Sequence, residues 1–120
     1  MKHMSFALTE RQLLTGHKTV TRRLHWWSLK PGDQLLAVQK CMGLKKGQKQ
    51  KRLAVIRVKN TRSEALENVT EQEARLEGFP HMTGGEFIAF FCKAMKCTPG
   101  TVVNRIEFEV LETFEKGTPP

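Results

Sequence analysis

The sequence predicts an α+β protein, mainly β, built as a small β-barrel or strongly bent sheet with short helices on its outside. Two observations support this fold class. Segments in which apolar and polar residues alternate, and which are rich in β-branched side chains, recur along the chain. Three other segments begin with a threonine that is followed three residues later by Glu or Gln, which is a helix-start signature.

Three helices are predicted from these signatures. The first begins after Thr9 and ends at Gly16, the second covers residues 71–77 and ends at Gly78, and the third follows Thr83. The third helix carries apolar side chains at helical spacing, which predicts that one of its faces packs on the core. These side chains are Phe87, Phe90, Phe91 and Met95.

Four strands are predicted, with a fifth candidate near the N-terminus. The four are Thr19 to Arg23, Gln34 to Lys40, Arg52 to Asn60 and Thr101 to Glu112, and the fifth candidate is Met4 to Ala7. The sequence Lys-Pro-Gly-Asp at 30–33 is typical of a turn. Residues 42–51, which hold two glycines and four lysines, are expected to form a long hairpin arm.

One domain accounts for the whole chain. Its 120 residues are 39% hydrophobic and 27% charged, which is enough to build one core. We expect the domain to cover residues 1–114 and residues 115–120 to form a frayed tail. The sequence has no apolar run near the roughly 18 residues that span a bilayer, and no secretion signal, so we expect a cytoplasmic protein without a membrane partner.

The cysteines do not indicate a disulfide framework or a metal site. Cys41, Cys92 and Cys97 are odd in number and lack the C-x-x-C spacing. A zinc site that combines them with His81 is an alternative, but it lacks paired ligand spacing. No metal or other cofactor is therefore expected.

Positive charge is concentrated in one part of the sequence. The formal net charge is +8, and residues 17–62 hold thirteen lysines and arginines against a single acid, Asp33, whereas residues 63–120 carry more acids than bases. Such segregation is typical of a surface that meets nucleic acid phosphates, although a generally solubilising basic surface is the alternative. The candidates for phosphate contact are Lys45, Lys46, Lys49, Lys51 and Arg52.

The segment Gly-His-Lys-Thr-Val-Thr-Arg-Arg at 16–23 gathers cations and hydroxyls in one short turn and strand. Lys18, Thr21, Arg22 and Arg23 together indicate a pocket for an anion or a polarised carbonyl group. The alternative interpretation is a helix-ending glycine followed by a threonine-rich strand with a solvated basic end.

The order of these motifs resembles that of ASCH domains, the activating signal cointegrator homology group. The resemblance is carried by Gly16-x-Lys18-x-x-x-x-Arg23, the turn at 30–33, a Val-Thr-Glu helix start at 69–71 and a closing Arg-Ile-Glu-Phe strand at 105–108, and it covers most of the chain. It implies a PUA-like β-barrel with flanking short helices and an association with RNA.

One branch of this family is similar enough to imply catalytic residues. Its members are bacterial amidohydrolases that remove the acetyl group from N4-acetylcytidine, and they use a lysine, a threonine three residues later, and a glutamate near the end of the helix that begins with Thr-Glu. The resemblance therefore implies Lys18, Thr21 and Glu77 as catalytic residues. The chain differs from that branch at three places, which are Arg22 in the motif, a longer arm at 42–51 and an added helix within 79–97.

The implied chemistry sets two requirements on Lys18. A threonine hydroxyl is a weak nucleophile, so Lys18 can act as its base only when neutral, which requires the lysine pKa to fall by roughly 3 from about 10.4, or about 4 kcal/mol. Burial and the nearby Arg22 and Arg23 act in that direction. Lys18 must also lie in the turn before the strand, because residues 18 and 21 of a regular strand point to opposite faces.

Glu77 and the two tryptophans each have two interpretations. A carboxylate in the last turn opposes the helix dipole by about 0.3 to 1 kcal/mol, which favours a functional role for Glu77; the alternative is a solvated acid. One of Trp26 and Trp27 is expected to fill the core and the other to stack on a base, for about 1 to 3 kcal/mol, with Trp26 as the candidate for ligand contact.

These observations predict a domain that binds a nucleobase or nucleotide, with RNA or a nucleoside as its partner. The cleft is framed by Lys18, Thr21, Arg23 and Glu77, and the basic arm holds phosphates. The alternative is a metal-independent amidohydrolase acting on N4-acetylcytidine-like nucleosides, which requires the Thr21 hydroxyl where a binding module does not. A ribonuclease is a third interpretation, for which the sequence offers basic groups but no histidine pair.

Overall fold

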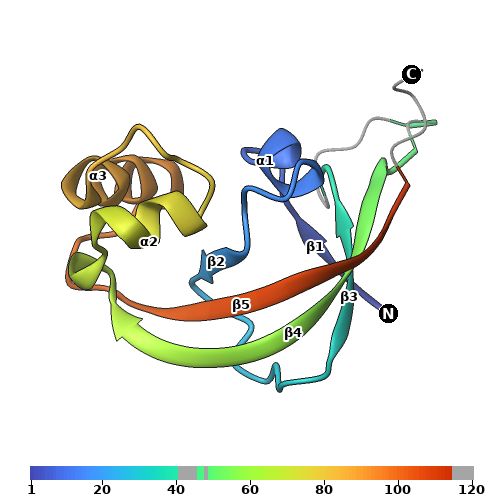
Figure 1. The fold of residues 1–120 in the computed structure, drawn as a ribbon, viewed down its shortest axis with the longest axis horizontal. Helices are drawn as coiled ribbons and strands as arrows, with labels where there is room; N and C mark the ends of the chain where they lie inside the picture. The colour runs from blue at the N-terminus through green and yellow to red at the C-terminus, as the bar shows by residue number, and fades with distance from the viewer. Residues whose placement is uncertain (41–45, 48, 115–120) are drawn as a thin grey trace.

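One curled sheet organises the protein. The computed structural model describes residues 1–40, 46–47 and 49–114, and within them five strands form one sheet in the order β1-β3-β4-β5-β2. β1 pairs with β3 in parallel, and the other neighbours are antiparallel. The sheet curls into a half-barrel (Figure 1), so the α+β, mainly β, prediction is confirmed. The strands are β1 Lys2–Ser5, β2 Val20–Arg23, β3 Gln34–Val38, β4 Arg52–Ala65 and β5 Val102–Thr113.

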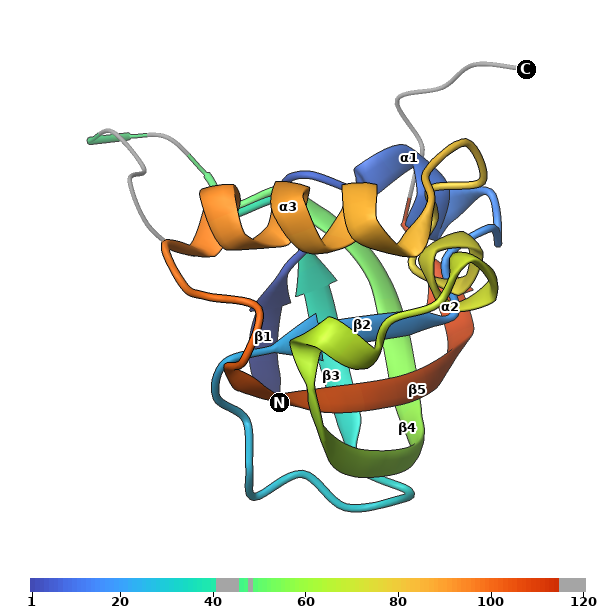
Figure 2. The same ribbon diagram turned by 90° about the vertical axis from the view of Figure 1, so that its left-hand side faces the viewer.

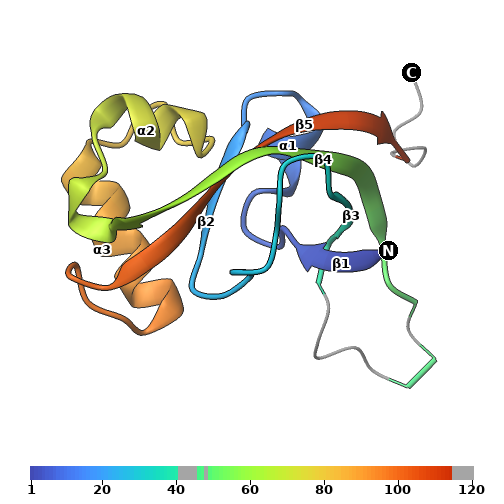
Figure 3. The same cartoon turned by 90° about the horizontal axis from the view of Figure 1, so that it is seen from below.

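The long β4–β5 ribbon shapes the half-barrel. β4 continues to Ala65, beyond its predicted end at Asn60, because it stays paired with β5 down to the pair Ala65 and Val102. Two register shifts interrupt the pairing, between Val55 and Ile56 and between Val58 and Asn60. Such irregularities increase the local twist and bend the strand, which fits the strong curve of the ribbon (Figure 3).

Three α-helices are present in the described residues, and their N-termini differ from one another. They are α1 Glu10–Leu14, α2 Glu71–Leu76 and α3 Gly84–Met95. Thr83 forms a complete capping box with Glu86, and Thr70 accepts a hydrogen bond from the Glu73 backbone amide. The capping box predicted at Thr9 is wrong: its side chain makes no capping hydrogen bond, and it is buried instead.

The core consists of two clusters. The first lies among the strands and α1 and includes Phe6, Leu13 and Phe108. The second includes Phe87 and Phe91 of α3 together with Val103 of β5. α2 and α3 lie together at one end of the β4–β5 ribbon, and α3 runs across the sheet (Figures 1 and 2).

Further expectations concern membrane spans, the C-terminal tail and the predicted arm. No helix in the described residues is long and apolar enough to cross a membrane. The predicted frayed tail at 115–120 and part of the predicted arm, residues 41–45 and 48, lie outside the described residues.

Gly78 ends α2 with a φ of +103°, and a side chain there would come within 2.8 Å of Gln12, so only glycine fits between α2 and α1.

Candidate functional site

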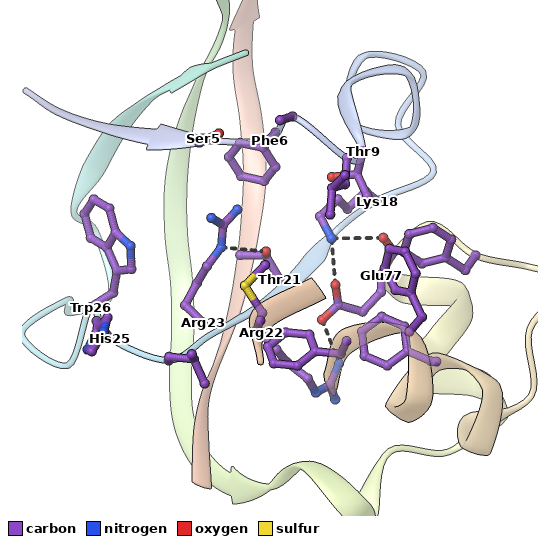
Figure 4. A pocket seen from close by; sticks show the side chains of 18 residues that line it. Ser5, Phe6, Thr9, Lys18, Thr21, Arg22, Arg23, His25, Trp26 and Glu77 are labelled. Carbon is purple, nitrogen blue, oxygen red and sulfur yellow. Dashed lines mark hydrogen bonds and ion pairs between the residues drawn. The ribbon is translucent and has the colours of Figure 1, made fainter. Parts of the chain in front are cut away.

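A cavity of about 350 Å³ lies where the two core clusters meet. Its lining comes from residues 5–9 at the end of β1 and in the loop to α1, from β2 and its flanks, from the end of α2 and from α3. Lys18 and Glu77 lie at one end, Trp26 lies at the other, and Thr21 and Arg23 lie between them (Figure 4). The cavity thus combines residues that are far apart in the sequence.

Lys18 reaches the cavity because it precedes the regular part of β2, which begins at Val20. The backbone amide of Lys18 donates to the carbonyl of Gln12 in α1 at 3.0 Å, and that of Thr19 donates to the carbonyl of Leu76 in α2 at 2.9 Å. These contacts keep the segment out of the pleat, so Lys18 and Thr21 line the same cavity. The geometric requirement set by the sequence is therefore met.

Lys18 and Glu77 form a buried ion pair, and each residue is only 3% exposed. The Lys18 Nζ donates to Glu77 Oε1 at 2.7 Å and to the Glu77 carbonyl oxygen at 2.9 Å. Glu77 is the C-cap residue of α2. Because its carboxylate is buried and paired with Lys18, it is not the solvated helix-end acid of the alternative interpretation.

Burial is the largest influence on the pKa of Lys18 and lowers it, the Glu77 carboxylate raises it, and the cations Arg23 and Arg22 lower it, so that the pKa lies below its ordinary value. Desolvation disfavours the ammonium form, and like charges nearby act in the same direction. At a given pH, a larger fraction of Lys18 is therefore in the neutral amine form than of a lysine on the surface.

Arg22 lines the cavity and belongs to a network of alternating charges. Its Nη1 donates to Glu77 Oε2 at 3.0 Å, its Nε donates to Glu64 at 2.8 Å, and its Nη2 bonds to Glu73. Arg105 donates to the same Glu73 at 2.7 Å. Each guanidinium nitrogen of Arg22 has a carboxylate partner, so this side chain holds Glu77 in place at the cavity.

Glu73 is the carboxylate that joins two arginines in this network. Partial burial raises its pKa, but the hydrogen bonds and the positive charges of Arg105 and Arg22 together lower it more, and the pKa lies at about 2. Glu73 therefore stays ionised throughout the neutral and mildly acidic range.

Thr21 is oriented by its neighbour Arg23. Its Oγ1 accepts a hydrogen bond from Arg23 Nε at 3.0 Å, and Thr21 is buried. The Arg23 guanidinium lies over the ring of Phe6, with Cζ 4.8 Å from the ring centroid. The Thr21 hydroxyl keeps its own proton for donation.

The two tryptophans have different surroundings. Trp26 packs against the first core cluster and lines the cavity, whereas Trp27 is 53% exposed and is not part of the lining. Trp26 adopts a left-handed backbone with a φ of 71°, and its carbonyl accepts a hydrogen bond from Asn104 at 2.9 Å.

The arm cations that the structure describes do not line the cavity. Lys46 and Lys49 are exposed, and Lys45 lies outside the described residues. Lys51 pairs with Glu10 of α1 at 2.6 Å, and the Arg52 guanidinium lies 4.8 Å from the ring centroid of Phe114. The base of the arm is thereby tied to α1, which follows the cavity-lining loop 5–9.

Several lining residues were not expected from the sequence. Thr9 was assigned to a helix cap, Phe6 to a candidate strand, and Leu8 and Phe79 to no site. The sequence offered one indirect signal for these residues, which is that apolar side chains occur outside the predicted helices, where no helix face needs them. The acids of the charge network, Glu64 and Glu73, were also not predicted to belong to the site, because nothing in the sequence distinguishes them from surface acids.

The alternative chemistries have little support from side-chain placement. Within the described residues, no three His, Cys, Asp or Glu side chains are grouped so that they hold a metal ion, and the alternative zinc site includes Cys41, which lies outside those residues. His25 is the one histidine in the described lining, so a histidine pair for ribonuclease chemistry is not formed there.

Comparisons with known proteins identify the fold. No protein-family model and no curated protein matches the chain. The structure is similar to protein EF3133 of Enterococcus faecalis V583, of family DUF984, with 18% identity and a TM-score of 0.67 over 98% of this chain and 80% of that one. It is also similar to an ASCH domain from Lactobacillus crispatus JV V101, with 17% identity and a TM-score of 0.59 over 92% and 79%. At such identities the likeness concerns the fold alone, which is ASCH-like and therefore of the expected PUA-like kind.

Proposed function

We propose that the cavity binds a single nucleobase, presented by a nucleoside, a nucleotide or a single-stranded RNA. The observation that carries this proposal is the buried Lys18–Glu77 pair inside a cavity with aromatic walls. Proteins recognise unstacked bases by stacking on aromatic side chains and by hydrogen bonds to the base edges. The volume of about 350 Å³ lies near the lower end of ligand pockets, about 300 to 1,000 Å³, and suits one base.

The pair retains hydrogen-bonding capacity for a base edge. An ammonium has three donors, of which Lys18 uses two, and a carboxylate has about four acceptor positions, while Glu77 meets one cation at each oxygen. One donor and further acceptor positions therefore remain. They complement a base that combines a carbonyl or ring-nitrogen acceptor with an exocyclic amine, as cytosine does.

The remaining candidates act around this pair. Trp26, at the opposite end of the cavity, offers an indole for stacking. Exposed Lys46 and Lys49, with Lys45 beside them in the sequence, would contact phosphates of an RNA strand. If about four of the arm cations neutralise phosphates, the logarithm of the binding constant should fall against the logarithm of salt with a slope of about −3.

Titration of the four common nucleosides and a short single-stranded RNA, followed by tryptophan fluorescence, tests the proposal. We expect saturable binding that is strongest for bases with an exocyclic amine. Lys18→Met should weaken it at least about tenfold, because a charged hydrogen bond is lost. Lys93→Met, on the exposed side of α3, is the control and should have no effect. Absence of binding at low salt, or equal affinity for a folded Lys18→Met, would refute the proposal.

A metal-independent amidohydrolase is the second candidate function. The observation that favours it is that Lys18, Thr21 and Glu77 all line one cavity, with a lysine whose pKa is lowered. Arg23 donates to the Thr21 Oγ1 at 3.0 Å and would stabilise negative charge that develops on this oxygen. Arg22 holds the Glu77 carboxylate against Lys18.

The reaction would proceed by acyl transfer in two steps. The Thr21 oxygen attacks the acyl carbon while neutral Lys18 takes its proton; the carbon–nitrogen bond then breaks, and Lys18 gives that proton to the departing amine. Water next attacks the threonine ester with Lys18 again as the base, and the proton returns to Thr21 as the acid leaves.

Incubation with N4-acetylcytidine, followed by chromatography of the nucleoside, tests this candidate. Thr21→Ala should abolish cytidine formation and Thr21→Ser should retain part of it. Lys18→Arg should be nearly inactive, because a guanidinium does not deprotonate. The rate should rise as pH increases through the lowered Lys18 pKa, since the neutral amine is the base. Full activity in Thr21→Ala would eliminate threonine as the nucleophile.

A further inference from the structure

One wall of the cavity is entirely apolar and comes from α3. The side chains that α3 contributes to the lining are Phe87, Phe90, Phe91 and Met95. The buried Phe87 and Phe91 belong to the second core cluster, whereas Phe90 is partly exposed and Met95 is 41% exposed. The whole predicted stripe of this helix therefore borders the cavity, but only Phe87 and Phe91 are buried in the core, and Phe90 and Met95 are more exposed.

Phe79 extends the apolar wall up to the ion pair. It follows Glu77 with only Gly78 between them, and its ring centroid lies 5.1 Å from that of Phe90 and 5.9 Å from that of Phe87. The aromatic surface thus continues from α3 onto Phe79, which lines the same cavity as Glu77.

The rim of the cavity is apolar on two sides. Leu8, in the β1–α1 loop, lines the cavity and is 57% exposed, and Met95 lines it from α3. In the described part of the chain, every polar residue of the lining lies outside α3. A plain base that engages Lys18 and Glu77 would therefore leave Phe90, Met95 and Leu8 in contact with water.

We propose that the bound base carries an apolar substituent on its exocyclic nitrogen, larger than an acetyl group, which packs on Phe90 and Met95. This inference rests on the proposed function, because it assigns the exocyclic nitrogen to Glu77. A nitrogen with one substituent keeps one N–H for the carboxylate, and the substituent then continues along Phe79 toward α3. Burial of apolar surface raises affinity by about fourfold per methylene group.

A homologous series of ligands without a cleavable amide separates this inference from hydrolysis. Cytidine and adenosine are compared with their N4-alkyl and N6-alkyl derivatives that carry methyl, butyl and hexyl groups, and equilibrium binding is measured by titration calorimetry. We expect the affinity in one of the two series to rise by about fourfold per methylene from methyl to butyl. The gain should level off once the chain extends past Met95.

Two matched variants locate the substituent. Met95→Ser should weaken binding of the hexyl compound about fivefold and leave the parent nucleoside unchanged, since only the apolar contact is reduced. Leu111→Ser alters a side chain that is also 41% exposed but lies on β5 outside the lining, and it should change neither affinity. Melting temperatures verify that both variants are folded.

Three outcomes would overturn the inference. If the parent nucleoside binds but affinity does not increase with chain length, the α3 wall does not receive a substituent, and the proposed function stands. If no member of either series binds, the proposed function fails together with the inference. If the wild type self-associates and Met95→Ser does not, a second copy of the chain covers the rim instead.

Discussion

The β4–β5 ribbon carries two sets of opposite charges that differ in their surroundings. At the α2 end, Glu64 of β4 and Arg105 of β5 belong to the buried network around Arg22, whose side chain is 0% exposed. Further along the same ribbon, Arg57 of β4 pairs across the strands with Glu109 of β5, and these side chains are 43% and 44% exposed. In the sequence, the two sets have the same appearance.

The difference between the two sets lies in what covers them. α2 supplies Glu73 and Glu77 to the first set and removes water from it, whereas the second set faces solvent. A buried charge is costly unless each partner is present, while an exposed pair gains little because water screens it. The buried set therefore fixes the geometry beside the cavity, and the exposed set contributes little to stability.

Replacement of Arg22 should have the largest effect on stability. Arg22→Leu leaves the carboxylates of Glu64, Glu73 and Glu77 without their shared cation, and we expect a loss of about 3 to 5 kcal/mol in the free energy of unfolding. Urea denaturation measures it. Arg22→Lys keeps the positive charge but cannot donate to three carboxylates in the fixed geometry of a guanidinium, so its loss in the free energy of unfolding should be intermediate. A loss below about 1 kcal/mol for Arg22→Leu would mean that burial does not distinguish the two sets.

Acidification should affect the buried set next. The pKa of Glu73 lies at about 2 in the folded protein, against an ordinary value of 4.5 for this carboxyl group. The contribution of Glu73 to stability is therefore complete above about pH 4.5 and is lost as the pH falls toward 2. Glu73→Gln should therefore flatten the dependence of melting temperature on pH in this window. Glu109→Gln is the control from the exposed set, and an equal flattening there would contradict the comparison.

The exposed set should show the smallest effect. A double-mutant cycle with Arg57→Ala and Glu109→Ala should give a coupling energy of about 0.2 to 1 kcal/mol. This energy should decrease further as salt is added, because the pair is open to counterions. A coupling above about 2 kcal/mol, unaffected by salt, would show that the ribbon itself strengthens ion pairs regardless of cover.

Local signals predicted most of the elements. The alternation of apolar residues in 101–112 and the complete capping box at Thr83 both act within a few residues, and β5 and α3 follow them closely. Thr9 carries the same signature as Thr83, yet its side chain is buried at the cavity. The extension of β4 to Ala65 was not predictable either, because it depends on pairing with β5 and not on the polar sequence at 61–65.

The sequence alone determined the types of the elements, their order and a short motif in which Lys18 and Thr21 precede and enter a strand, because propensity, capping and spacing are local properties. It also indicated Glu77 through the resemblance to one family branch. Only the tertiary structure decided that Glu77 pairs with Lys18 and that Arg22 binds three carboxylates. It also decided that the α3 stripe borders a cavity as well as the core. These outcomes depend on which residues α2, α3 and the curled sheet bring together and remove from water, and burial of that kind is a property of the folded chain as a whole.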